Sequence, residues 1–215
     1  MSQNRPRYGA VPTLRTGQAY PHPEPIGGAH SPVELMPGYR VVVLDQRKLP
    51  QIERYEHLSR VDEVAEAIRA MLVRGAPAIG VCAAYGMVAA AAAAQGDGAS
   101  FLEAMGSAER MLRATRPTAV NLAWALDRMI EAAAGAAILD PVARTERLAQ
   151  EARALHEAEV AACRAIGALG VPFVPAGATV LTHCNAGALA PAGYGTALGV
   201  VRAAHAAGKN VRVLS

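Results

Sequence analysis

Residues 179–196 read TVLTHCNAGALAPAGYGT, and this stretch decides the fold class. Its apolar start predicts a short strand that stops at a cysteine, and glycines follow. Residues 195–207 are typical of a helix, and residues 211–214 predict a second strand. Strand, loop, helix and strand in this order form the first unit of a parallel, Rossmann-like sheet.

Helical patterns dominate the part of the chain that precedes this unit. Residues 39–45 predict a strand, and residues 51–58 are its candidate partner. Ser59 is predicted to cap a helix, with Asp62 completing a capping box and the helix stopping at Arg74-Gly75. The other predicted helices cover residues 76–94, 101–113, 118–134 (capped by Thr118) and 141–168, the last starting at Asp140-Pro141.

The predicted fold class is therefore α/β with three regions. Residues 1–37 are rich in Pro, Gly and His without periodicity, and predict a flexible N-terminal extension. Residues 38–172 predict a mostly helical N-terminal domain with a short β-sheet. Residues 173–215 predict the first β-α-β unit of an incomplete Rossmann-like domain. A two-stranded unit leaves apolar faces and an open edge, so we expect these 215 residues to be one segment of a longer chain, inactive and prone to associate alone.

Composition favours a soluble globular protein. The chain is 52% hydrophobic and 18% charged, with a formal net charge of +3. No block of basic residues follows one helix face, which argues against nucleic acid as a partner. Residues 76–94 carry no charge, but most of them are alanine, which favours a buried helix over a membrane span.

The three cysteines, Cys82, Cys163 and Cys184, show no zinc-site spacing, and an odd number argues against a disulfide framework. The polar N-terminal residues contain no apolar segment of a secretory signal peptide. The sequence therefore predicts a cytoplasmic protein.

Three segments carry candidate functional residues. In VRGAPAIG (73–80), Arg74, Gly75 and Ala76 form a turn before a helix, where a glycine lets an anion approach the backbone. A plain helix-turn-helix with a capping glycine is the alternative there. In TRPTAVNL (115–122), Arg116 precedes a proline and offers a planar fork that suits phosphate, or it is a solvated loop arginine.

The third candidate is Cys184, at the strand end where an open α/β sheet places its ligand crevice. A thiol beside helix-terminal amides can act as a proton carrier or nucleophile, and the alternative is a small buried apolar residue. Cys82 and Cys163 lie in predicted helices and are interpreted as core or surface fillers. A dinucleotide fingerprint fails because Leu198 occupies its third glycine position, and no Walker-type motif occurs.

Together, RGAPAIG, TRPTAVNL and THCNAGALAPAGYGTALGV, in this order, resemble the 5-methylthioribose-1-phosphate isomerases of methionine salvage. The resemblance runs from about Gly38 to the last residue and includes LDQRKLP (44–50). The wider group contains regulatory subunits of a translation initiation exchange factor and ribose-1,5-bisphosphate isomerases.

The resemblance implies an aldose-ketose isomerase that converts 5-methylthioribose 1-phosphate to 5-methylthioribulose 1-phosphate. It implies a homodimer with no metal or nucleotide cofactor, and no nucleic-acid or membrane partner. Arg74, Gly75, Ala76 and Arg116 match substrate-binding positions, and Cys184 matches the catalytic-site cysteine. The catalytic aspartate, a glutamine and an Asn-Lys pair of this family lie beyond residue 215.

Four alternatives remain open at this point. 5-Deoxyribose 1-phosphate is a plausible second substrate, because nothing in the sequence reads the 5-substituent. A noncatalytic sensor of a sugar phosphate or nucleotide, like the translation-factor relatives, is a second hypothesis. A ribose-1,5-bisphosphate isomerase and a dinucleotide-binding domain are two further alternatives.

Overall fold

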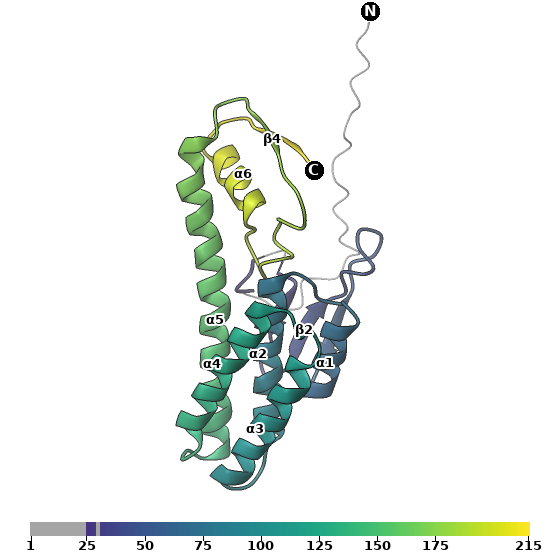
Figure 1. Ribbon diagram of the computed structural model, residues 1–215, viewed down its shortest axis with the longest axis vertical. Helices are drawn as coiled ribbons and strands as arrows, with labels where there is room; N and C mark the ends of the chain where they lie inside the picture. The colour runs from purple at the N-terminus through teal and green to yellow at the C-terminus, as the bar shows by residue number, and fades with distance from the viewer. Residues whose placement is uncertain (1–24, 29–30) are drawn as a thin grey trace, which may run out of the picture.

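The computed structural model describes residues 25–28 and 31–215 (Figure 1). It has the mixed α/β class that the sequence predicts: a helical bundle, an antiparallel sheet beside it, and a small parallel β-α-β unit at one end. The α-helices are α1 (Val61–Arg69), α2 (Ala76–Ala93), α3 (Gly98–Arg113), α4 (Val120–Ala136), α5 (Pro141–Gly170) and α6 (Ala197–Ala206).

The antiparallel sheet has the order β1-β2-β3, with β1 at Val33–Leu35, β2 at Val41–Leu44 and β3 at Tyr55–Leu58. The predicted pairing of the 39–45 and 51–58 segments is confirmed, with Val42 opposite His57. β1 lies within the segment predicted to be a flexible extension, so that prediction is wrong for this stretch. Its two apolar residues are 1–2% exposed because they join the core, whereas most of the extension lies outside the described residues.

Helix α1 begins and ends at residues other than those predicted. Its N-cap is Arg60 rather than Ser59, and the carboxylate of Glu63 accepts the Arg60 amide at 3.1 Å, a role predicted for Asp62. The helix ends five residues before Arg74, because Met71 adopts a left-handed φ of 61°. The Leu72 amide then donates to the Ala67 carbonyl at 2.9 Å, which closes a Schellman-type C-terminus without glycine.

Helix α2 is the centre of the bundle. By length and composition it is apolar enough to cross a membrane, but 78% of its 18-residue window is buried by the surrounding elements. Its small residues allow close packing: a Cβ added at Gly80 would lie 2.8 Å from the backbone oxygen of Asn121 on α4. An alanine-rich, chargeless helix is therefore explained by helix–helix contact, as predicted.

The predicted N-caps of helices α5 and α4 have different outcomes. Asp140 caps α5 as predicted, and its carboxylate accepts the amides of Val142 and Ala143 at 3.0 Å. Helix α4 has Ala119 as its N-cap, with no side-chain capping bond, so the predicted cap at Thr118 is wrong.

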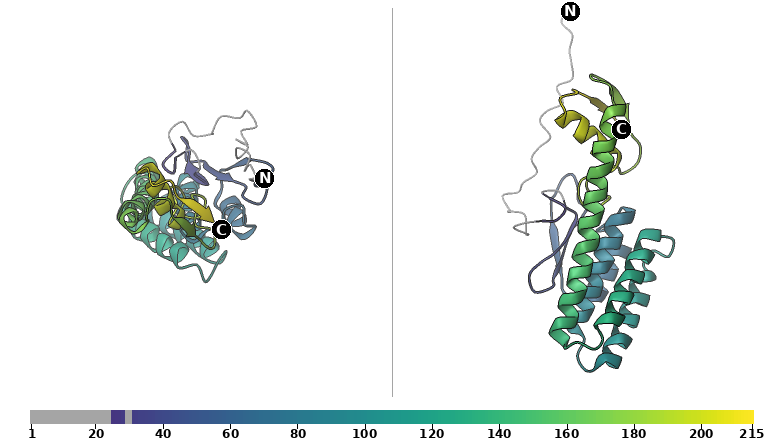
Figure 2. Two further views of the ribbon diagram at one scale, coloured as in Figure 1. Left: turned by 90° about the horizontal axis from the view of Figure 1, so that it is seen from above. Right: turned by 90° about the vertical axis from the view of Figure 1, so that its left-hand side faces the viewer.

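The β-α-β unit confirms the strand–loop–helix–strand prediction. β4 (Thr179–Leu181) pairs in parallel with β5 (Arg212–Leu214), and α6 connects them. A short 3-10 helix, Val171–Phe173, separates α5 from β4. Figure 2 shows α5 continuing past the other bundle helices, with α6 packed along this extension. The loop between β4 and α6 consequently returns to the top of the bundle.

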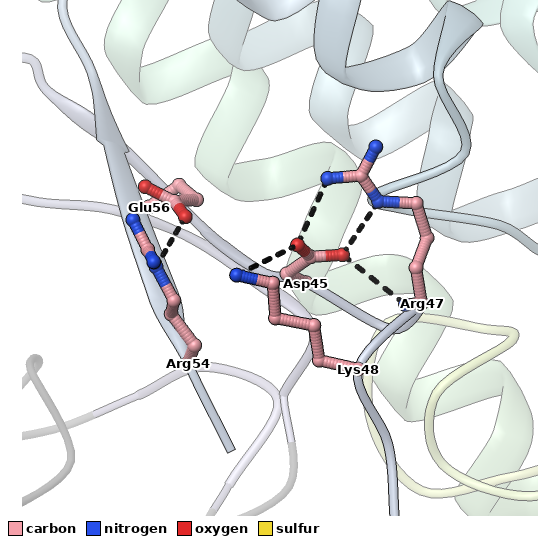
Figure 3. A network of polar contacts seen from close by, with 5 residues as sticks. All are labelled: Asp45, Arg47, Lys48, Arg54 and Glu56. Atoms are coloured by element: carbon pink, nitrogen blue, oxygen red, sulfur yellow. Dashed lines mark hydrogen bonds and ion pairs between the residues drawn. The ribbon is translucent and has the colours of Figure 1, made fainter. Parts of the chain in front are cut away.

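An ion-pair cluster fixes the turn that follows β2 (Figure 3). The Asp45 side chain is 1% exposed, and its carboxylate accepts from Arg47 Nε at 2.8 Å and Arg47 Nη2 at 2.9 Å. Lys48 Nζ lies 4.0 Å from the same carboxylate. Hydrogen bonding to Arg47 holds the pKa of Asp45 below its ordinary value, despite burial. In the same turn, the Gln46 amide donates to the Leu72 carbonyl at 2.9 Å, two residues before Arg74.

Candidate functional site

The Arg74–Ala76 turn lies against the loop between β4 and α6. Gly75 has φ 110° and ψ 129°, a conformation reserved for glycine. A Cβ there would lie 2.4 Å from Ala190 Cα, so the turn and the loop approach at backbone contact distance. The Ala78 amide donates to the Ala190 carbonyl at 3.0 Å. The N-terminus of α2 is therefore tied directly to the loop that follows β4.

The same loop, residues 182–196, folds back on itself. The Ala186 carbonyl accepts the amides of Thr196 and Leu198 at 3.1 and 3.2 Å, at the start of α6. Gly195, with φ 106°, sits so close beneath this carbonyl that an added Cβ would lie 3.1 Å from it. Cys184 has φ 67° and is exposed. The alternative that it is a small buried residue is therefore wrong.

A cavity of about 680 Å³ lies between the turn and the loop. It brings together two of the three predicted segments, because Arg74, Gly75, Ala76 and Cys184 all line it. Its lining residues are Arg74, Gly75, Ala76, Pro77, Cys184, Asn185, Ala190, Pro191 and Thr196. The other lining residues were not among the candidate site residues predicted from the sequence, and no local motif distinguishes them: Pro77, Asn185, Ala190, Pro191 and Thr196.

Arg116 does not line this cavity. It is half-buried in the turn before α4, where its carbonyl accepts the Ala119 amide at 3.0 Å. Its predicted substrate contact consequently stays a prediction.

The electrostatics of the cavity favour an anion. Arg74 is exposed and, within residues 25–28 and 31–215, has no carboxylate at ion-pair distance. The first residues of α2 line the cavity, so the positive end of an 18-residue helix meets the arginine there. The described residues contain no group of three or more His, Cys, Asp or Glu side chains that would hold a metal ion.

The three cysteines differ in environment. Burial raises the pKa of the fully buried Cys82 thiol to about 12. Burial, and then the charge of Glu159, raise the pKa of the Cys163 thiol to about 11. Both are 0–1% exposed, as expected of filler residues. Cys184 is the exposed one, and it lies in the cavity.

Known proteins share the sequence pattern and the fold of this chain. The profile of the Initiation factor 2 subunit family matches residues 72–215, which contain all three predicted segments. The chain belongs to the Initiation factor 2 subunit family. Within it, the chain is 51% identical over 179 residues to a methylthioribose-1-phosphate isomerase of Geobacter metallireducens, covering 82% of this chain and 51% of the relative.

Other members of the Initiation factor 2 subunit family are similar at comparable levels. A methylthioribose-1-phosphate isomerase of Anaeromyxobacter sp. (strain K) is 55% identical over 175 residues, 81% of this chain and 48% of its own length. The chain spans about half the length of these curated relatives.

Two solved structures share the fold. The 5-methylthioribose 1-phosphate isomerase from Pyrococcus horikoshii OT3 matches with a TM-score of 0.79 and 32% identity, over 88% of this chain and 61% of that one. The translation initiation factor eIF-2B, subunit delta, from A. fulgidus matches with a TM-score of 0.77 and 37% identity, over 85% and 53%. The structural likeness therefore includes both an isomerase and a translation factor.

Proposed function

We propose that this chain carries substrate-binding residues and the catalytic cysteine of an isomerase that converts 5-methylthioribose 1-phosphate to 5-methylthioribulose 1-phosphate. One observation carries the proposal: Arg74, the α2 N-terminus and Cys184 line one cavity. The relatives named methylthioribose-1-phosphate isomerase at 51–55% identity support the same reaction.

The phosphate group is the part of the substrate that these residues suit. A guanidinium and helix-terminal amides together supply charge-assisted hydrogen bonds to a dianion. Because the C1 oxygen is phosphorylated, the ring cannot open as a free hemiacetal does. The C1–ring oxygen bond must break with a proton delivered to the ring oxygen, and the resemblance assigns that proton to an aspartate of the family's second domain.

The second half of the reaction is an internal redox exchange. Hydrogen moves from C2 to C1, so C1 is reduced while the C2 hydroxyl becomes a ketone, and no external oxidant is needed. Cys184 lines the same cavity as the Arg74–Ala76 turn, and there it would carry the proton between C2 and C1 or shape the transition state of a hydride shift. Arg116 is proposed as a second substrate-binding residue in the complete protein.

The test is an isomerase assay on the complete protein with 5-methylthioribose 1-phosphate and 5-deoxyribose 1-phosphate, which differ at the 5-substituent. We expect turnover of the first, with Cys184→Ser lowering kcat by about 10²-fold or more. Cys163→Ser is the matched control, because that thiol lies outside the cavity. Turnover of neither compound by the unaltered protein would refute the proposal and leave a noncatalytic sugar-phosphate sensor, which the likeness to the eIF-2B subunit favours as second candidate.

The complete protein is also proposed to be a cytoplasmic homodimer, on the resemblance alone. Light scattering on the purified complete protein gives its mass, and a monomer at micromolar concentration contradicts the dimer.

A further inference from the structure

A buried histidine joins three segments of the fold, one of which is the loop that lines the candidate site. His156, in the middle of α5, is 0% exposed. Its Nε2 lies 2.7 Å from the Ala192 carbonyl oxygen in the loop, and its Nδ1 lies 2.8 Å from the Tyr85 hydroxyl on α2. Glu34 Oε2, on β1, is 3.9 Å from Nδ1.

The partners determine where the imidazole carries its proton. A carbonyl oxygen only accepts, so Nε2 must be the N–H that donates to Ala192. Nδ1 is then the acceptor for the Tyr85 hydroxyl. Burial holds the pKa of His156 below its ordinary value, although the nearby charge of Glu34 acts in the opposite direction. The side chain is therefore a neutral, directed donor.

Ala192 needs this donor more than an ordinary loop residue does. It is an alanine at φ 59°, a left-handed conformation that the Cβ disfavours, and it is 0% exposed. A buried carbonyl without a donor is strongly destabilising. Gly27 closes the other side, since an added Cβ there would lie 2.3 Å from the Ala192 oxygen.

The loop conformation fixed at Ala192 extends to both sides of the cavity. Two residues earlier, the Ala190 carbonyl accepts the Ala78 amide and meets Gly75. The next residue, Gly193, packs on Val160, one turn after His156 on α5, and donates to the Ala188 carbonyl at 2.8 Å. The α5 face that begins at His156 thus supports the loop that carries Cys184.

We infer that His156 is a positioning residue, whose hydrogen bond to the Ala192 carbonyl sets the conformation of loop 182–196 and thereby holds Cys184 in the cavity that Arg74 also lines. Its consequence for turnover rests on the proposed isomerase activity. Its consequence for the loop does not, so the two are measured separately.

The experiment uses the complete protein with three variants. His156→Phe keeps a ring but removes the donor. His156→Gln restores an N–H at the reach of Nε2. Leu148→Ala removes a buried side chain eight residues earlier on α5 and is the stability control. The readouts are the alkylation rate of Cys184 with iodoacetamide, hydrogen exchange at the Ala78 amide, and kcat against KM.

For His156→Phe we expect about 10-fold faster exchange at Ala78 and a changed Cys184 alkylation rate, since an orphaned buried carbonyl shifts a local equilibrium by about that factor. We expect kcat to fall about 10-fold with a smaller change in KM, and Gln to restore each quantity to within about 3-fold. Leu148→Ala should lower the melting temperature but leave Ala78 exchange and Cys184 alkylation unchanged.

If His156→Phe behaves like Leu148→Ala in exchange and alkylation, the positioning role is overturned. If those two readouts shift as expected but the unaltered protein lacks isomerase activity, the positioning role stands and the proposed function fails. Should His156→Phe not fold, His156→Asn replaces it, because its shorter amide cannot reach the Ala192 carbonyl whereas Gln can.

Discussion

Replacing Gly75 by alanine tests the backbone contact on which the candidate site depends. Gly75 has a φ of 110°, which glycine adopts readily. An alanine held in this conformation would be strained by about 1–3 kcal/mol. The added Cβ would also lie 2.4 Å from the Cα and 2.5 Å from the carbonyl oxygen of Ala190, which are backbone atoms and cannot rotate away. Overpacking of this kind costs a further 1–3 kcal/mol or so. We therefore expect Gly75→Ala to lower the free energy of unfolding by about 2–6 kcal/mol.

The matched control is Gly208→Ala. Gly208 also has a positive φ, 77°, but an added Cβ would meet no atom within 4 Å. Only the left-handed conformation is then disfavoured, by about 1–2 kcal/mol. Urea denaturation of both variants measures the difference, and Cys184 alkylation reports whether the loop has moved. A Gly75→Ala protein no less stable than Gly208→Ala, with unchanged alkylation, would refute the contact between the turn and the loop.

Three further predictions follow from the described side chains. Iodoacetamide should alkylate Cys184 at least about 10²-fold faster than Cys82 or Cys163, since burial suppresses both reagent access and thiolate formation at the latter two. Peptide mass spectrometry over time measures the three alkylation rates, and equal labelling contradicts the prediction. Asp45→Asn should lower the free energy of unfolding by about 1–3 kcal/mol at neutral pH. Because the folded pKa of Asp45 lies below 3.8, its contribution is complete above that pH and is lost as pH falls further; urea titrations at several pH values should show a weaker acid dependence in the variant, and an unaltered one contradicts the ion pair. The pKa of buried His156 lies below 6.5, so stability should decrease as pH falls below that value, and His156→Gln should reduce this slope; an identical slope would mean that other groups cause it.

The sequence predicted the elements whose cause is local. The chargeless α2, the Asp140 cap and the strand–loop–helix–strand order each depend on periodicity or on one capping side chain within a few residues. The end of α1 was mispredicted because Met71 takes the left-handed position that glycine usually fills, which no propensity indicates.

The site was predictable as three segments but not as an arrangement. Cys184 and the Arg74–Ala76 turn are 108 residues or more apart in sequence, and their meeting depends on the length of α5 and on the Ala78–Ala190 hydrogen bond. His156 had a signal of helical spacing, since it and Val160 lie on one face of α5 beneath the loop. Its hydrogen-bond partner is a backbone carbonyl, which every residue has, so the sequence does not identify it.

The most direct test of the central claim is whether a sugar phosphate and Cys184 share one cavity. The measurement is the alkylation rate of Cys184 in the complete protein, titrated with 5-methylthioribose 1-phosphate, for the unaltered protein and for Arg74→Met. We expect saturable protection of Cys184 in the unaltered protein, and protection that requires at least about 10-fold more ligand once the guanidinium is removed. Alkylation of Cys184 at the same rate with and without saturating ligand would contradict this claim.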